Sequence, residues 1–156
     1  MAPKKKTETP VTEVLEIKVK YHDEDIGKIE KFPVGDWIDL RAAERVDLNA
    51  LCFKVISLGI SVKLPEGYEM HILPRSSTFR RWGLLMTNSM GIIDESFCGE
   101  NDILGFPALA MRPTTIFKGD RICQFRIMKK MPEVRFTEVD RMEDEDRGGF
   151  GSTGKA

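Results

Sequence analysis

The sequence has few of the residues that form disulfides or hold transition metals. Its 156 residues include three cysteines and two histidines, and no two cysteines stand in a CxxC pair. A small, odd number of cysteines is typical of a protein from a reducing compartment, so we expect Cys52, Cys98 and Cys123 to be reduced thiols that are buried or half-buried. The sequence therefore argues against a disulfide framework and a zinc site, and it favours a cytoplasmic location.

Long apolar runs and a large net charge are also missing. No run approaches the ~20 apolar residues that a membrane-spanning helix needs, and no apolar segment follows the basic start Lys4–Lys6 as in a signal peptide. The formal net charge is −1, so no overall basic field attracts nucleic acid or an anionic membrane. We therefore expect no membrane association and no direct nucleic-acid binding.

Alternation of apolar and polar residues, the pattern of half-buried β-strands, dominates the chain. The segments that show it are 15–21, 60–64, 68–72, 122–127 and 134–139. The turn signal Pro65-Glu66-Gly67 predicts that the second and third of these segments form a hairpin. The helical signal is confined to 76–82, with Ser76 or Ser77 as the cap. Many short strands separated by turns predict an all-β fold, either a barrel, a sandwich or a jelly roll.

Both ends of the chain have compositions that cannot build a core. Residues 1–10 are basic and polar, and we expect them to be disordered. Residues 140–146 are acidic and 147–154 are rich in glycine, so we expect 140–156 to form a mobile arm. Residues 11–139 then fit a single β domain.

Two segments in the middle of the chain carry candidate chemistry. Pro74-Arg75-Ser76-Ser77 combines a cation, two hydroxyls and the first N–H groups of a helix, which together suit an anion; the alternative is a plain helix cap with a surface arginine. In 91–100 an apolar pair leads into Asp94 and then an aromatic ring, so a hairpin there could hold a flat ligand. The alternative is an ordinary hairpin with an Asx-type turn at Asp94.

Two further segments are weaker signals on their own. Residues 119–124, Gly-Asp-Arg-Ile-Cys-Gln, are typical of a turn that enters a strand. Residues 147–154, Arg-Gly-Gly-Phe-Gly-Ser-Thr-Gly, have glycines whose successive N–H groups can surround phosphate oxygens. Phe150 is an unusual apolar residue in that polar tail and would suit a lid over a flat ligand. The alternative for this tail is simple disorder.

Taken in order, the four segments resemble the motifs of the trimeric dUTPases, in the form found in Gram-positive bacteria and their phages. The resemblance runs from about Gly35 to Gly154 and includes Trp37-Ile38-Asp39-Leu40 near its start. It implies a jelly-roll-like subunit of the β-clip type and a homotrimer with shared active sites, in which residues 140–156 close a neighbouring site. The implied reaction is Mg²⁺-assisted attack of water on the α-phosphorus of dUTP. This reaction yields dUMP and pyrophosphate, keeps uracil out of DNA and supplies dUMP for thymidylate synthesis.

The resemblance also implies roles for single residues. Asp94 would orient and deprotonate the attacking water, and Asp39 would hold Mg²⁺ through water while the substrate phosphates hold the metal directly. The residues expected to bind substrate are Arg75, Ser76, Ser77 and Gln124 at the phosphates; Asn88, Gly91, Ile93 and Phe97 at the uracil and deoxyribose; and Arg147, Phe150, Gly151, Ser152 and Thr153 from the arm.

Three positions depart from the family pattern. Phe97 stands where the family usually has tyrosine, so the ring is kept and a hydroxyl is lost. Asp36-Trp37 occupies the place of a pair formed by a small residue and glycine. Arg147 lies three residues before Phe150 instead of five.

Two other functions are alternatives. dCTP deaminases have a related fold and a similar Arg-Ser-Ser segment, but they place a catalytic glutamate where this chain has Ile103-Leu104-Gly105-Phe106. A second alternative is a phage-type dUTPase that also binds a regulatory protein. An inserted domain or an altered arm would be the sign of that role, and the sequence shows no inserted domain.

Overall fold

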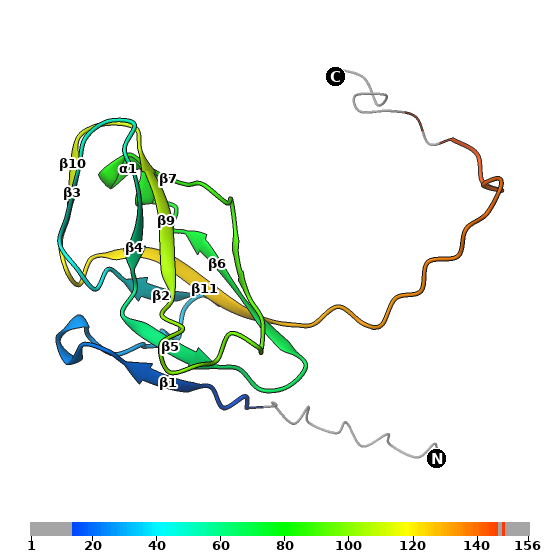
Figure 1. Ribbon diagram of the computed structural model, residues 1–156, viewed down its shortest axis with the longest axis horizontal. Coiled ribbons are helices and arrows are strands. Elements are labelled where there is room, and N and C mark those ends of the chain that lie inside the picture. The colour runs from blue at the N-terminus through cyan, green and yellow to red at the C-terminus, as the bar shows by residue number, and fades with distance from the viewer. Residues whose placement is uncertain (1–13, 147, 149–156) are drawn as a thin grey trace, which may run out of the picture.

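A computed structural model describes residues 14–146 and 148, which form an almost entirely β structure (Figure 1). The strands are β1 (Lys18–Tyr21), β2 (Ile38–Arg41), β3 (Val46–Leu48), β4 (Phe53–Ser57), β5 (Ile60–Lys63), β6 (Tyr68–Pro74), β7 (Leu84–Met86), β8 (Gly91–Ile93), β9 (Gly105–Ala110), β10 (Thr114–Ile116) and β11 (Arg121–Lys129). A 3₁₀ turn, η1 (Glu24–Ile26), and a short helix, α1 (Thr78–Trp82), are added to them. The all-β prediction is confirmed. No helix of the described segments has the length and apolar character needed to cross a membrane.

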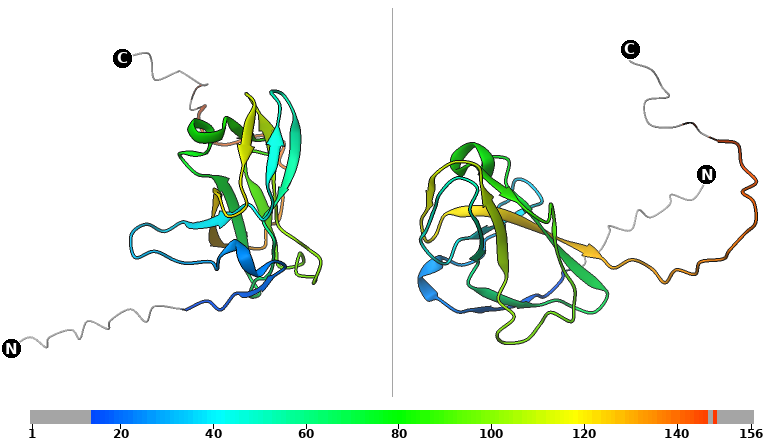
Figure 2. Two further views of the ribbon diagram at one scale, coloured as in Figure 1. Left: turned by 90° about the vertical axis from the view of Figure 1, so that its left-hand side faces the viewer. Right: turned by 45° about the horizontal axis from the view of Figure 1, so that its top comes forward.

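The strands pair antiparallel in four sheets. One sheet has the order β2-β11-β6-β8, a second has the order β4-β9-β7, and β1-β5 and β10-β3 are two-stranded. Figure 2 shows these sheets wrapped around a common interior. In the four-stranded sheet, β11 and β6 form the longest ladder, from Cys123 opposite Pro74 to Lys129 opposite Tyr68. This ladder is the frame on which the site residues are mounted.

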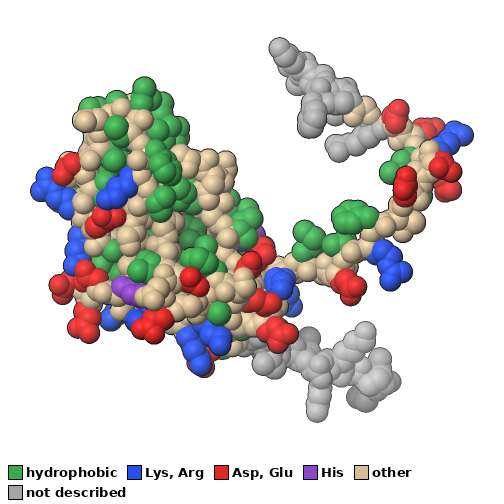
Figure 3. All heavy atoms as spheres, viewed as in Figure 1, with side chains coloured by type: hydrophobic (Ala, Val, Ile, Leu, Met, Phe, Trp, Pro, Cys, Tyr) green, Lys and Arg blue, Asp and Glu red, His purple; other side chains and the backbone are tan. Residues whose placement is uncertain are grey.

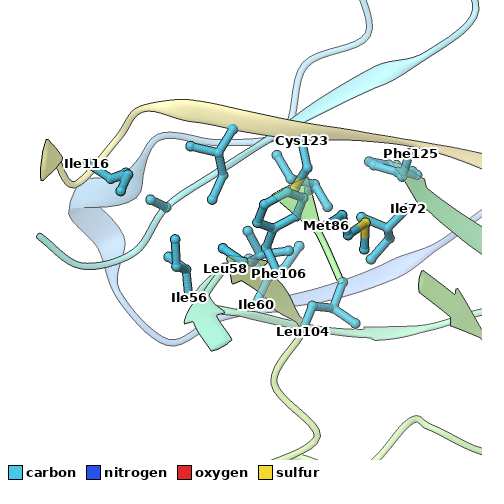
Figure 4. Packing of buried hydrophobic residues seen from close by; sticks show 14 of the residues in the cluster. Ile56, Leu58, Ile60, Ile72, Met86, Leu104, Phe106, Ile116, Cys123 and Phe125 are labelled. Carbon is cyan, nitrogen blue, oxygen red and sulfur yellow. The ribbon is translucent and has the colours of Figure 1, made fainter. Parts of the chain in front are cut away.

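The core is built by the inward residues of strands whose burial alternates along the chain. In β9, Phe106, Ala108 and Ala110 are fully buried, and in β6, Met70 and Ile72 are buried while their neighbours are not. Side chains from β4, β5, β9 and β11 meet around Phe106 (Figure 4). Because side chains of a strand alternate between its two faces, the other residues of β6 point away from this core.

The predicted hairpin of 60–64 and 68–72 is wrong. Both segments are strands, but β5 pairs with β1, whereas β6 pairs with β11 and β8. Three of the four residues of β5 are buried, which requires cover on both of its faces. A turn signal shows that the chain changes direction but not which strand each segment joins. After the buried Leu64 the chain crosses from one sheet to the other.

The predicted strand 134–139 is also wrong within this chain. After β11 the backbone runs away from the domain, as the orange segment of Figure 1 shows, and it forms no strand up to residue 146. Val134, Phe136 and Val139 are exposed, Phe136 by 93%. The alternating pattern gives this segment the side chains of a strand. A strand also needs a neighbouring backbone to pair with, and the described part of the chain offers none here.

The cysteine prediction is confirmed only for Cys123. This residue is fully buried in β11, and burial raises the pKa of its thiol. Cys52 and Cys98 are exposed instead, and all three are free thiols. Cys52 lies in the turn before β4 and Cys98 in the loop after β8, where neither side chain is needed to fill the core.

Candidate active site

The first half of the site forms where β6 ends and β11 begins. Pro74 is the last residue of β6, and α1 starts at Thr78, so Arg75, Ser76 and Ser77 form the turn between them. Next to this turn, β11 carries a β-bulge, because Arg121 and Cys123 are opposite consecutive residues of β2. Bulges commonly redirect side chains beside active sites.

Arg75 is held by a carboxylate and a carbonyl from two neighbouring strands. Its Nε lies 2.8 Å from Oδ1 of Asp39, and its Nη1 donates to the carbonyl of Arg121 at 3.2 Å. The second oxygen of Asp39 accepts from Nη1 of Arg121 at 3.1 Å. Asp39 is only 16% exposed and Arg75 22%, so this ion pair is shielded from water and is stronger than a surface pair. The guanidinium of Arg75 is therefore fixed in one orientation.

Gln124 completes this cluster. It is opposite Asp39 in β2 and Leu73 in β6, so its side chain shares the outward face with Asp39, and its Nε2 donates to the carbonyl of Pro74 at 3.3 Å. Ser76 is exposed, and Ser77 is the residue before α1, as predicted. The side chain of Ser77 makes no capping hydrogen bond, which leaves its hydroxyl to another acceptor. Of the residues predicted at the phosphates, the structure thus brings together Arg75, Ser76, Ser77 and Gln124.

The second half of the site is the loop that follows β8. Asp94 is exposed, and its Oδ1 accepts from the N–H of Ser96 at 2.7 Å and from the hydroxyl of Ser96 at 2.5 Å. This is the Asx-type turn that was the alternative for the segment, although the residue still faces solvent. The Ser96 hydroxyl, and then its N–H, hold the pKa of Asp94 below the ordinary value for aspartate. The carboxylate is therefore ionised throughout the neutral range.

The residues predicted at the base and sugar lie before, within and after β8. Asn88 is exposed in the turn before β8, Ile93 is half-buried at the end of β8, and Phe97 is 38% exposed in the following loop. Gly91 is buried against β6, and a Cβ there would lie 3.2 Å from the Met86 side chain and 3.4 Å from Cβ of Ile72. The segment is a turn, a short strand and a loop instead of the single hairpin that was expected.

Glu95 anchors this loop and was not predicted as a site residue. Its Oε2 accepts from the N–H of Gly67 at 2.8 Å, and its Oε1 pairs with Nζ of Lys130 at 2.8 Å. The ion pair with Lys130 and the hydrogen bond from Gly67 lower the pKa of Glu95. The contacts join the loop to the turn before β6 and to the end of β11. A sequence pattern could not reveal them, since the three residues are far apart in the chain.

The two halves lie at opposite ends of β6. Ile93 is opposite Met70, so Asp94 follows at the level of Glu69, whereas Arg75 comes after the last residue of the strand. At ~3.3 Å per residue the six steps from Glu69 to Arg75 span about 20 Å. If Arg75 binds the phosphates as predicted, we expect the α-phosphorus to lie out of reach of Asp94 of the same chain. One chain therefore presents two half-sites.

The remaining predicted residues, Arg147, Phe150, Gly151, Ser152 and Thr153, lie outside the described residues. The described residues offer few direct ligands for a magnesium ion. No three His, Cys, Asp or Glu side chains of the described segments are grouped to hold a metal. Asp39 already accepts from two guanidinium groups, but each carboxylate oxygen has a second lone pair for a metal-bound water. This donor set fits a Mg²⁺ that is held mainly by substrate phosphates.

Comparison with known proteins identifies the family. The model of the dUTPase family matches residues 37–154, which include both half-sites. The chain belongs to the dUTPase family. This finding confirms the resemblance of the sequence motifs, and it favours dUTPase over dCTP deaminase.

The match to two dUTPase relatives covers nearly the whole length of each relative. The SPbeta prophage-derived deoxyuridine 5'-triphosphate nucleotidohydrolase YosS of Bacillus subtilis (strain 168) is 59% identical over 140 residues, which are 90% of this chain and 99% of that protein. The deoxyuridine 5'-triphosphate nucleotidohydrolase of Finegoldia magna is 37% identical over 144 residues, covering 88% and 99%. The prophage origin of the first relative agrees with the predicted Gram-positive and phage-like form.

Solved structures of dUTPases have the same fold. The dUTPase of Staphylococcus bacteriophage 80alpha with dUPNHPP has a TM-score of 0.72 at 22% identity and covers 89% of this chain and 98% of its own. The dUTPase of Streptococcus mutans has a TM-score of 0.68 at 22% identity, covering 76% and 98%. A dUTPase of phage phi11 of S. aureus, in which a structural Mg(II) ion is coordinated, has a TM-score of 0.70 at 20% identity, covering 83% and 99%. The jelly-roll-like dUTPase fold predicted from the sequence is thereby confirmed.

Proposed function

We propose that the protein hydrolyses dUTP to dUMP and pyrophosphate by attack of water on the α-phosphorus. The observation that carries the proposal is the presence of an oriented guanidinium, Arg75, and an exposed, ionised carboxylate, Asp94, in a chain that matches the dUTPase family. An anion clamp and a base are the two groups that phosphate hydrolysis needs.

In the proposed mechanism the phosphate chain binds at the turn after β6. Arg75 directs its remaining N–H groups to the phosphates, the hydroxyls of Ser76 and Ser77 donate to the same oxygens, and Gln124 lies beside them. Arg147, Ser152 and Thr153 add donors from the arm. A bound Mg²⁺ would supply neutralisation of the phosphate charge. Asp39 would hold that ion through water.

Asp94 acts on the water. Because its carboxylate is ionised at neutral pH, it accepts the proton as the water attacks, and a positioned base of this kind increases the rate by about 10²–10⁴. Its pKa lies below the usual range, so it is a weak base with a fixed orientation. Ser96 supplies that orientation through two hydrogen bonds.

Uracil is selected by the backbone of the segment Asn88–Phe97, with Asn88 as a side-chain contact. Gly91 and Ile93 lie on β8, an edge strand of its sheet, and their backbone groups would pair with uracil. Cytosine would leave these groups unpaired, at about 1–3 kcal/mol for each buried group. Phe97 packs on the deoxyribose and excludes a 2′-hydroxyl. Phe150 covers the base from the arm, with Gly151 giving the backbone room to approach.

The separation of the half-sites leads us to propose a homotrimer with shared active sites. The Arg75 half-site of one chain meets the Asp94 half-site of the next. Since these are different surfaces, the contact is head-to-tail, and it closes into a ring. The family resemblance implies three copies. Residues 134–139 have the alternating pattern of a strand, but no strand of the described chain pairs with them. We expect this segment to extend the sheet of an adjacent chain and to direct the arm 140–156 to the active site of that chain.

An exposed apolar face supports this assembly. The outward side of the β4-β9-β7 sheet carries Phe53 opposite Leu109, with Leu85 on the other side of Leu109, and Val55 opposite Pro107. Phe53 is 57% exposed and Val55 53%. Figure 3 shows hydrophobic side chains gathered over β4 and β9. A continuous apolar sheet face of this kind is typical of a subunit interface.

The substrate prediction is tested by product analysis. The protein with Mg²⁺ and each deoxynucleoside triphosphate in turn should release pyrophosphate from dUTP alone. Removal of Mg²⁺ with a chelator should reduce the rate strongly. Ammonia released from dCTP would instead identify a deaminase, and the absence of pyrophosphate from dUTP would overturn the proposal.

The interface prediction is tested by Val55→Asp. Burying an unpaired carboxylate costs several kcal/mol per ion, so the variant should elute as a monomer with little activity. Light scattering after gel filtration measures the mass. Val34→Asp is the matched control, because Val34 is 90% exposed in the loop before β2 and lies outside the apolar face. It should remain oligomeric and active. A trimeric Val55→Asp protein would show that this face is not the interface.

The pH dependence of turnover should respond to Ser96. Ser96 lowers the pKa of Asp94, so Ser96→Ala should raise that pKa towards the ordinary value. The base is active only when deprotonated. The acidic limb of the kcat profile should therefore move to higher pH in the variant, while the rate above neutrality changes less. An acidic limb at the same pH in both proteins would exclude Asp94 as the group that titrates.

A further inference from the structure

Thr78 is the most deeply buried polar side chain among the described residues. Its exposure is 0%, and the other buried polar residue, Ser61, retains 5%. Thr78 is the first residue of α1 and directly follows the Arg75–Ser77 turn. A buried hydroxyl is costly unless both of its hydrogen-bonding functions are used, so its partners are informative.

Both functions of this hydroxyl are used, and both lead to the phosphate half-site. Oγ1 accepts from the N–H of Arg75 at 2.9 Å and donates to the carbonyl of Ile122 at 2.8 Å. The N–H of Thr78 also donates to the carbonyl of Arg75 at 3.0 Å. Thr78 thus binds both backbone groups of Arg75 and links them to β11.

The carbonyl that accepts from Thr78 belongs to the β-bulge. Ile122 lies between Arg121 and Cys123 and has no register partner in β2 or in β6. The hydroxyl therefore occupies a position that a regular ladder would fill with a backbone N–H. On either side of this contact, the Arg121 carbonyl binds the Arg75 guanidinium and the Arg121 side chain binds Asp39. The backbone of Arg75 is held by Thr78 and its side chain by Asp39.

We propose that Thr78 is a positioning residue for the phosphate-binding turn, a role that rests on the proposed function. The hydroxyl holds the turn against the bulge, so that Arg75, Ser76 and Ser77 present their donors in one geometry before the triphosphate arrives. Donors that are oriented in advance bind without the cost of ordering, and a shift of a fraction of an ångström weakens them. Thr78 itself does not touch the substrate.

The test separates positioning from simple stabilisation by comparing two ligands. An imido analogue of dUTP uses the whole phosphate turn, whereas dUMP uses only its single phosphate. Thr78→Val keeps the shape of the side chain and removes the hydroxyl, and it should weaken binding of the analogue about tenfold or more, equivalent to at least about 1.4 kcal/mol. dUMP should bind with less than about threefold change, because most of its contacts are at the base and sugar. Thr78→Ser, which retains the hydroxyl, should bind the analogue about as tightly as the unchanged protein does.

Ile56→Val is the control for stability, because Ile56 is fully buried in β4, away from the turn. It should lower the melting temperature without changing either affinity. If Thr78→Val does not fold, Thr78→Ala is measured in the same way. Equal losses for both ligands, or no loss for either, would overturn the positioning role while leaving the proposed function intact. A wild-type protein that bound neither ligand would overturn both.

Discussion

Replacing Asp94 by asparagine should remove most of the turnover of dUTP and leave nucleotide binding nearly unchanged. The substitution keeps the size of the side chain and an oxygen that can accept from Ser96, but it removes the negative charge that takes the proton of the water. A general base is worth about 10²–10⁴ in rate, so kcat should fall by that factor. Steady-state assays of pyrophosphate release measure the rate, and titration with an imido analogue of dUTP measures binding.

A matched substitution in the same loop controls for local damage. Asp102 accepts a hydrogen bond from the N–H of Gly99 at 2.7 Å, and Asp102→Asn retains an oxygen for this bond. This variant should keep a kcat close to that of the unchanged protein. A fully active Asp94→Asn protein would exclude Asp94 as the base, and an equal loss in both variants would indicate a disturbed loop.

Mixing two inactive variants should restore activity. Arg75→Ala removes the phosphate clamp and Asp94→Asn removes the base, so each protein alone should be nearly inactive. The two residues are about 20 Å apart along β6 and must serve different sites. In trimers assembled at random from equal amounts of the two variants, about one quarter of the sites receive both intact residues, since each comes from a different chain. Co-refolding followed by activity assays measures the recovery.

A second mixture distinguishes shared sites from sites within one chain. When the double variant is mixed with an equal amount of unchanged protein, shared sites predict about one quarter of full activity, whereas sites within one chain predict about one half. The mixture of single variants would stay inactive in the second case. That result would overturn the proposed sharing of the active sites.

Much of the fold class and the site chemistry followed from local pattern. Alternation predicted strands near 15–21, 60–64, 68–72 and 122–127 because a strand buries every second side chain, a requirement that acts on neighbouring residues. The motif around Arg75 and the carboxylate at Asp94 could also be named as candidates, since anion binding and base catalysis depend on which groups are present. The structure places Arg75, Ser77 and Gln124 beside one another, and their binding of substrate stays a prediction.

Partners distant in the chain could not be predicted in this way. The alternation in 60–64 and 134–139 did not reveal that the first pairs with β1 or that the second has no neighbour within the described chain. The contacts of Asp39 with Arg75, of Glu95 with Lys130 and of Thr78 with Ile122 arise only when β2, β6 and β11 lie side by side. Local sequence therefore indicated some of the strands and which groups can do chemistry. Strand pairing, which depends on backbone contacts between remote segments, decided where those groups meet and why one chain carries two separate half-sites.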